Sequence, residues 1–167
     1  DIDASRITFA EVYEKWSDVE YRTLSDSSVK GYKSVYNHCS SIHNKVFKEL
    51  KKTHLQGVID EIAAHSAAEL CKFLFMKMYK FGLENDIVEK DYSKFVKLPK
   101  KQAAKKKIPF TKDEINLLWE KVDEIKYADF TLILLYTGMR IGELLDITKE
   151  NIHLDQRYMI GGKKTAA

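Results

Sequence analysis

The 167-residue sequence contains few cysteines, prolines and glycines: two, two and seven, respectively. So few prolines and glycines argue against a loop-rich or disordered chain, and a hydrophobic content of 44% is sufficient for a buried core. No apolar stretch approaches the roughly 20 residues of a membrane-spanning helix, and the polar N-terminus does not have the pattern of a signal peptide. Cys39 and Cys71 lack paired spacing, so we interpret both as reduced thiols. These absences predict a soluble, cytoplasmic protein.

Positive charge is concentrated in one part of the chain, although the net charge of the whole sequence is only +3. Residues 1–90 carry 13 basic and 14 acidic side chains, whereas residues 91–167 carry 15 and 11. The segment 92–112 contains no acidic residue, lacks hydrophobic periodicity and includes both prolines. Its composition predicts an extended, solvated linker at residues 99–109. The eight lysines of the segment are Lys94, Lys97, Lys100, Lys101, Lys105, Lys106, Lys107 and Lys112.

Four helices are predicted in the N-terminal part of the chain. A capping box at residues 8–11 precedes the first helix, and the second is expected at residues 26–47. Capping boxes at residues 53–56 and 66–69 predict the third and fourth helices, the last of which ends at Gly82. Short connections between four helices indicate a compact all-α domain. The residues expected in its core are Phe9, Val12, Tyr13, Trp16, Val29, Tyr32, Tyr36, Cys39, Leu55, Val58, Ile59, Ile62, Leu70, Phe73, Leu74, Met78 and Phe81.

A second domain is predicted to begin near residue 110. A capping box at residues 111–114 starts its first helix. A nearly continuous apolar helix at residues 130–136 follows, and we expect it to be buried on most sides. Residues 157–160 have the pattern of a short strand, for which no partner strand is evident. The apolar face of the first helix of this domain consists of Ile115, Leu118, Trp119 and Val122.

The most specific pattern in the sequence is the run LLYTGMRIGELL, from Leu134 to Leu145. An apolar helix ends at Gly138, and Arg140 follows at the start of a second amphipathic segment. A guanidinium binds phosphate oxygens in a planar, two-point geometry, so an arginine presented from such a corner is suited to hold an anion. On its own, an arginine after a helix-ending glycine is usually a surface residue or a helix cap. The extended pattern, Thr-Gly-x-Arg followed by x-x-Glu-Leu, is much more specific.

This extended pattern resembles the first arginine motif of the tyrosine recombinase (phage integrase) family. The preceding helical domain and the basic linker resemble the same family, so the resemblance covers essentially the whole chain. It implies a mainly α fold, with a SAM-like core-binding bundle of four helices at residues 1–98 and the basic linker at residues 99–109. Residues 110–167 would then be the mostly helical beginning of an α+β catalytic domain.

The resemblance also implies roles for individual residues. Arg140 would contact the scissile phosphate, because phosphoryl transfer without a metal takes its electrostatic stabilisation from fixed side-chain donors. Glu143 lies one helical turn further on and either supports Arg140 or is an ordinary exposed carboxylate. The family also uses a lysine on a β-hairpin after this helix to protonate the leaving 5′ oxygen. Lys163 and Lys164 are the candidates here, and Lys164 is favoured because it directly precedes a threonine.

Other catalytic residues of the family have no counterpart in the sequence. A His-x-x-Arg pair, a further His or Trp and a nucleophilic tyrosine are expected downstream, and none of the nine tyrosines has a nucleophile context. A covalent mechanism needs its nucleophile, so we expect the chain to bind DNA but not to cleave it. We interpret it as a fragment of an integrase from a phage or an integrative mobile element. Many such integrases carry a small arm-binding domain before the bundle, and none is visible in these residues.

Double-stranded DNA is the expected partner. The family enters the major groove from the helical bundle, and the basic linker would join the two halves of a C-shaped clamp around the duplex. A polar helix surface and a solvated linker are the alternative interpretations of these residues. The candidates on the second and fourth helices are Ser27, Ser28, Lys30, Lys33, His38, Ser66, Lys72 and Lys77. The linker candidates are Lys100, Lys101, Lys105, Lys106 and Lys107.

The intact relative would exchange DNA strands as a tetramer through a 3′-phosphotyrosine intermediate in a bacterial host cell. It would need no metal or cofactor, and the present chain is expected to be a monomer without membrane contact. His38 and His43 lack the i,i+4 register of a helical metal site. Two other classes remain open. One is a non-catalytic DNA-binding regulator with the same bundle, and the other is a helical interaction domain without a nucleic-acid ligand.

Overall fold

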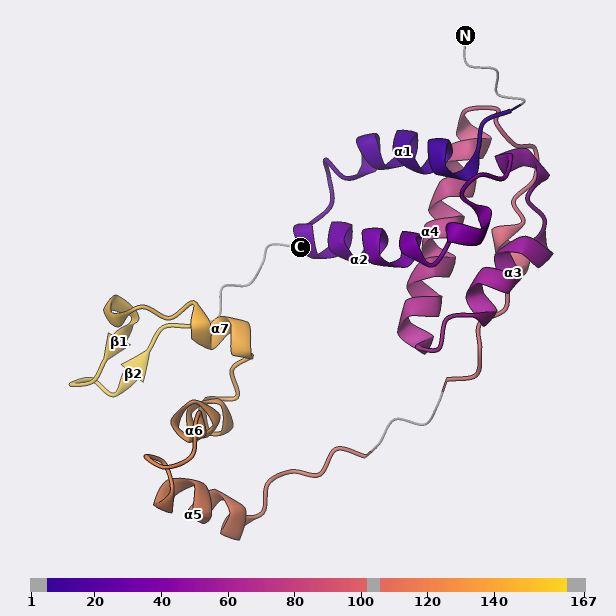
Figure 1. The fold of residues 1–167 in the computed structure, drawn as a ribbon. Helices are drawn as coiled ribbons and strands as arrows, with labels where there is room; N and C mark the ends of the chain where they lie inside the picture. Colours follow the sequence, from indigo (N-terminus) through magenta and orange to yellow (C-terminus); the bar gives the residue numbers. More distant parts are fainter. Residues whose placement is uncertain (1–5, 102–105, 162–167) are drawn as a thin grey trace. The chain divides into compact units, whose positions relative to one another are not determined.

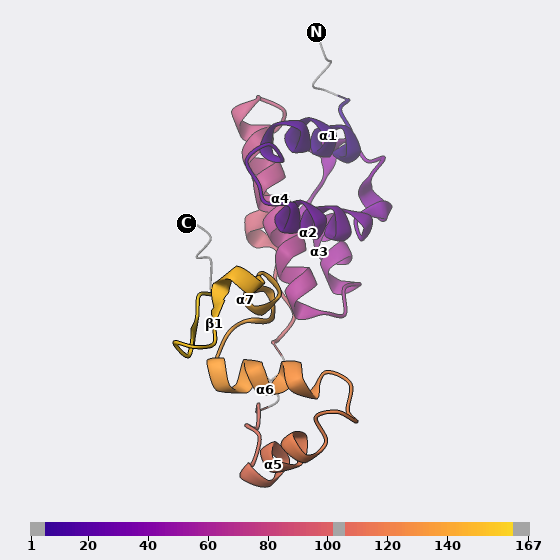
Figure 2. The same cartoon turned by 90° about the vertical axis from the view of Figure 1, so that its left-hand side faces the viewer.

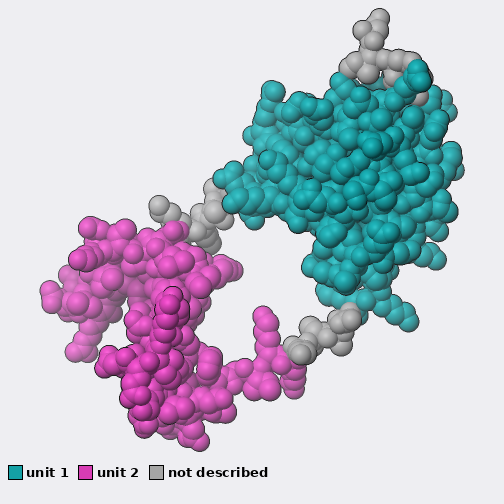
Figure 3. Space-filling model, viewed as in Figure 1, with its two compact units in different colours: residues 1–104 teal, residues 105–167 magenta. Residues whose placement is uncertain are grey.

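The computed structural model describes residues 6–101 and 106–161, which form a mainly helical protein (Figure 1). The chain divides into two compact units, residues 1–104 and residues 105–167 (Figure 3). The boundary between them falls within the lysine-rich segment. Within the described ranges, no helix combines the length and the apolar character that crossing a membrane requires.

Unit 1 is organised around its longest helix. Its elements are α1 (Phe9–Glu20), α2 (Asp26–Asn37), η1 (Ser40–Ile42), η2 (Phe47–Glu49), α3 (Lys52–Asp60), α4 (His65–Glu84) and η3 (Ser93–Phe95), where η denotes a 3₁₀ turn. Helices α1, α2 and α3 and the turn η3 all pack on α4 (Figures 1 and 2). Because α4 contacts all of these elements, its buried residues form the centre of the unit. They are Ala68, Cys71, Leu74, Phe75, Met78, Tyr79 and Gly82.

The start of α1 has the structure that its sequence predicts. The Glu11 N–H donates to Thr8 Oγ1 (3.3 Å), and the Thr8 N–H donates to the Glu11 carboxylate (2.8 Å), which completes the capping box. The predicted apolar face of this helix is buried. Tyr13 on this face stacks on Tyr36 near the end of α2, with the ring centres 3.7 Å apart. Tyr36 also stacks on His43, with the ring centres 4.2 Å apart. The short-range pattern of residues 8–16 was therefore sufficient to predict this helix.

The predicted second helix is too long. Helix α2 ends at Asn37, and the chain then turns through η1 and η2. The cause is a contact with the start of the chain's first helix, because the Phe9 N–H donates to the Lys45 carbonyl (2.9 Å) and the Phe47 N–H donates to the Ile7 carbonyl (2.8 Å). Tertiary hydrogen bonds of this kind override helical periodicity.

The capping boxes predicted at residues 53–56 and 66–69 are wrong. Helix α3 begins at Lys52, where the Lys51 N–H donates to His54 Nδ1 (3.1 Å), and α4 begins at His65 without a side-chain cap. Helix α4 also continues past Gly82, where a Cβ would meet side chains of η2 and of the following segment at 3.1 Å. That glycine allows close packing rather than ending the helix. The predicted core residue Phe73 is half exposed.

Unit 2 contains short helices and a small sheet. Its elements are α5 (Lys112–Glu120), α6 (Ala128–Thr137), α7 (Ile141–Leu145), η4 (Lys149–Asn151), β1 (Ile152–His153) and β2 (Tyr158–Met159). Helix α5 begins with the predicted capping box, in which the Glu114 N–H donates to Thr111 Oγ1 (3.3 Å). The predicted strand at residues 157–160 does have a partner, because β1 pairs with β2 in antiparallel register. A tight turn with Arg157 at φ 55° makes this pairing possible.

Helix α6 is less buried than its composition predicts. It packs on α5, but Ala128 and Leu132 are the only buried residues among those described in unit 2. Ile133 and Tyr136 on the same helix are 40% and 67% exposed. The expectation of burial on most sides is therefore wrong for these residues, because the described part of unit 2 has too few elements to cover the helix.

Candidate functional site

The candidate site begins with the corner at residues 137–140, where α6 ends. Gly138 has φ 67°, in the left-handed region that glycine adopts at little cost, and its N–H donates to the Leu134 carbonyl (2.9 Å). The Thr137 hydroxyl donates to the Ile133 carbonyl (2.6 Å) and accepts from the Met139 N–H (3.3 Å). These hydrogen bonds fix the direction of the chain before it reaches Arg140.

Arg140 leaves this corner with its side chain 87% exposed. Its Nη1 donates to Glu143 Oε1, and its backbone N–H donates to Glu143 Oε2, both at 2.9 Å. A guanidinium carries five N–H donors. The guanidinium of Arg140 makes no other hydrogen bond to the described residues, so most of its donors have no protein partner there. A planar fork that is held on one side and open on the other is suited to a phosphate.

Glu143 is held in its charged form by the same contacts. The hydrogen bond from the Arg140 backbone N–H is the largest cause that lowers the pKa of Glu143, followed by the hydrogen bond and the charge of the Arg140 side chain. The Glu143 side chain is 26% exposed, whereas that of Arg140 is 87% exposed. A pair whose arginine is this exposed contributes little to folding stability, so its main effect is to orient the guanidinium.

The hairpin of β1 and β2 returns the chain to the corner. The Ile160 N–H donates to the Asn151 carbonyl (2.8 Å). A Cβ added at Gly161 would lie 2.6 Å from Met139 Cε and 3.3 Å from Ile147 Cδ1. Gly161 therefore packs closely against the residue that precedes Arg140. The candidate lysines at positions 163 and 164, like Lys105 of the linker, lie outside the described residues.

The candidate DNA-contact residues of unit 1 fall into two groups. Ser27, Ser28, Lys30, Lys33, His38 and Ser66 are exposed, and so are the described linker lysines Lys100, Lys101, Lys106 and Lys107. Two others make contacts within unit 1, because Lys72 Nζ donates to the Val96 carbonyl (2.8 Å) and Lys77 Nζ pairs with the Glu20 carboxylate (3.4 Å). Lys72 therefore stabilises the segment after η3, whatever else it binds.

Two features of unit 1 had no signal in the sequence. One is a pair of buried thiols: Cys39 and Cys71 lie with their Sγ atoms 3.8 Å apart, although 32 residues separate them. Spacing along the chain gave no indication of this contact.

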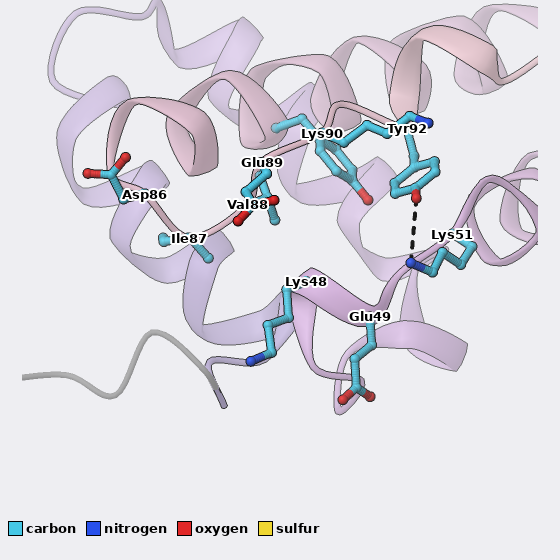
Figure 4. A pocket seen from close by; sticks show the side chains of 10 residues that line it. Lys48, Glu49, Lys51, Asp86, Ile87, Val88, Glu89, Lys90 and Tyr92 are labelled. Atoms are coloured by element: carbon cyan, nitrogen blue, oxygen red, sulfur yellow. Dashed lines mark hydrogen bonds between the residues drawn. The ribbon is translucent and has the colours of Figure 1, made fainter.

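The second feature of unit 1 without a signal in the sequence is an open pocket of about 570 Å³ between η2 and the segment after α4 (Figure 4). Lys51 Nζ and Lys90 Nζ lie 5.1 and 5.2 Å from the centre of the Tyr92 ring. The pocket is lined by as many carboxylates as lysines, so its charge favours neither anions nor cations. Its residues are Lys48, Glu49, Lys51, Tyr79, Asp86, Ile87, Val88, Glu89, Lys90 and Tyr92.

In comparisons with known proteins, no family model, no curated protein and no solved structure matches this chain.

Proposed function

We propose that this chain binds duplex DNA as part of a tyrosine recombinase, an integrase of a phage or an integrative mobile element. Residues 1–98 would form its core-binding domain, a SAM-like bundle, and residues 110–167 the first part of its catalytic domain. The observation that carries the proposal is the setting of Arg140, whose exposed guanidinium leaves a hydrogen-bonded corner and is braced by Glu143.

The chemistry required of Arg140 follows from the reaction. Charge builds on the phosphate oxygens in the pentavalent transition state, and fixed donors stabilise it best when they are already oriented. The corner at residues 137–140 and the Glu143 carboxylate supply such orientation. A mobile surface arginine would have to be ordered at each encounter, which costs side-chain entropy.

The hairpin supplies a second argument. Gly161 packs against Met139, so the chain passes the corner two residues before Lys163 and three before Lys164. We propose Lys164 as the general acid for the leaving 5′ oxygen, with Lys163 as the alternative. Because none of the nine tyrosines in the sequence has the context of a nucleophile, the chain would bind DNA without cutting it.

The linker lysines would add affinity that does not depend on DNA sequence. The described linker lysines Lys100, Lys101, Lys106 and Lys107 are exposed, and none of the ion pairs in the described ranges involves them. Lysines that approach phosphates displace condensed counterions, which makes the affinity fall with salt. Five or six such contacts predict a log–log slope of about −5.

The proposal is tested by fluorescence anisotropy of a labelled duplex titrated with the chain at about 50 mM and about 200 mM salt. The expected result is binding that weakens about 10³-fold between the two conditions. Binding that changes little with salt would show that the linker lysines do not contact the DNA phosphates. No binding at either salt concentration would contradict the proposal and favour a helical interaction domain instead.

A further inference from the structure

The two buried thiols of unit 1 form a contact whose chemistry is independent of the proposed function. Cys39 lies at the junction of α2 and η1, and Cys71 lies inside α4. Both side chains are fully buried, and their sulfurs are 3.8 Å apart. The chain contains no third cysteine, so any disulfide within it must join these two residues.

The local backbone allows the sulfurs to approach further. A disulfide has an S–S distance of about 2.05 Å, so the gap must close by about 1.8 Å. Cys71 is held in the helical ladder of α4, whereas Cys39 has φ −87° and ψ 10° in the turn between α2 and η1. Its thiol makes a weak hydrogen bond to the Val35 carbonyl (3.5 Å). The adjustment therefore falls on the Cys39 side chain, whose rotation breaks one weak contact. The backbone N–H and carbonyl of Cys39 keep their hydrogen bonds to Tyr36 and Ile42, both at 2.9 Å.

We propose that Cys39 and Cys71 are a site of oxidation, at which hydrogen peroxide converts the thiol pair to a disulfide. In the first step one sulfur attacks a peroxide oxygen, the O–O bond breaks, and a sulfenic acid and water form. In the second step the other sulfur attacks the sulfenic sulfur, the S–O bond breaks, and a second water leaves with the remaining thiol proton. Two thiols and one hydrogen peroxide thus give one disulfide and two waters, and the two sulfurs supply the two electrons that reduce the peroxide.

Burial determines how fast this reaction is. The contact with Cys71 and the loss of solvation both raise the pKa of the Cys39 thiol, which makes the reactive thiolate scarce. Oxidation is therefore slow compared with that of an exposed thiol. The same burial protects the disulfide, because a thiol reductant must reach a sulfur inside the core. Once formed, the bond ties α2 to α4 across 32 residues of sequence.

The test uses the wild-type chain under native conditions. The chain is incubated with hydrogen peroxide, quenched with catalase, unfolded in the presence of N-ethylmaleimide and weighed by mass spectrometry. The expected product has lost two hydrogens, carries no maleimide and yields a peptide pair that joins Cys39 to Cys71. Two maleimide groups, or sulfinic and sulfonic acids without a cross-link, would overturn the proposal.

Two further measurements exclude an unrelated modification. The Cys39→Ala chain, treated in the same way, is expected to retain a thiol at position 71 that reacts with the maleimide. The oxidised wild-type chain is expected to melt about 5–15 °C above the reduced chain, because the cross-link restricts the unfolded state. Reduction after unfolding should restore the original midpoint. A midpoint that falls on oxidation would show that the bond does not fit the native core and would contradict the proposal.

Discussion

One carboxylate, that of Glu143, accepts hydrogen bonds from both the backbone N–H and the guanidinium of Arg140, each at 2.9 Å. The two residues are one helical turn apart, so the sequence spacing alone places them within reach. Because the guanidinium is largely exposed, the pair fixes the direction of the guanidinium more than it stabilises the fold.

We expect Glu143 to titrate below the ordinary carboxyl value of 4.5, since the hydrogen bonds and charge of Arg140 lower its pKa. A carboxyl whose pKa is lowered by folding stabilises the folded state at pH values above its ordinary pKa of 4.5. This stabilisation is lost as the pH falls through the lowered pKa of the folded state. In Arg140→Ala the backbone N–H remains, so the pKa should rise only part of the way to 4.5. Carboxyl chemical shifts in an NMR pH titration measure both values. An unchanged pKa in the variant would show that the guanidinium does not contact Glu143 in solution.

Gly82 and Gly57 provide a matched test of packing in unit 1. Both lie inside helices, where alanine is favoured over glycine by about 1 kcal/mol. A Cβ at Gly57 meets nothing within 4 Å, so Gly57→Ala should raise the stability of unit 1 by about 0.5–1 kcal/mol. A Cβ at Gly82 meets Phe47 and Val88 at 3.1 Å, and the overpacking should cost about 1–3 kcal/mol.

The net effect of Gly82→Ala is therefore a loss of about 0–2 kcal/mol, and urea unfolding followed by circular dichroism measures both variants. Equal stabilisation by the two substitutions would show that the core around Phe47 is looser than the structure indicates.

Lys72 and Lys30 are both candidates for DNA contact, but only Lys72 makes a hydrogen bond that should stabilise unit 1. Lys72→Met removes the charged hydrogen bond to the Val96 carbonyl and should lower the stability of unit 1 by about 1–2 kcal/mol. Lys30 is exposed on α2, so Lys30→Met should change stability by less than about 0.5 kcal/mol. Thermal melts of the two variants measure the difference. Identical melting midpoints would contradict the structural role of Lys72.

Local patterns predicted helices that begin with their own side-chain caps. The capping boxes at Thr8 and Thr111 involve residues three apart and were predicted from that spacing. The same spacing at residues 53–56 and 66–69 formed no cap, so the pattern alone does not decide where a helix begins. The end of α2 was not predictable in this way, because it depends on hydrogen bonds between the segment at Lys45 and the start of α1. The partner of the short strand was missed for a similar reason, since a two-residue strand such as β1 has too little pattern to detect.

The candidate site was predicted in part. The corner at Gly138 and the contact between Arg140 and Glu143 follow from adjacent residues. The approach of Gly161 to Met139 depends on the β1–β2 hairpin, and the meeting of Cys39 with Cys71 depends on how α2 packs on α4. Contacts between distant segments require the fold to be known, and periodicity does not supply it.

We propose that Arg140 binds a DNA phosphate. DNA affinity tests this contact most directly when a second arginine serves as a control for charge. Arg157 is exposed in the turn between β1 and β2 and has φ 55°, a conformation that asparagine tolerates. Arg140→Ala and Arg157→Asn each remove one positive charge from unit 2, so any general effect of charge on DNA binding appears in both variants.

The measurement is the dissociation constant of wild type and both variants for the same labelled duplex at one salt concentration. A lost charge-assisted contact of about 1–3 kcal/mol predicts that Arg140→Ala binds about 5- to 150-fold more weakly than wild type. Arg157→Asn should show a much smaller change. Equal weakening in the two variants, or unchanged binding by Arg140→Ala, would contradict the assignment of Arg140 to a phosphate.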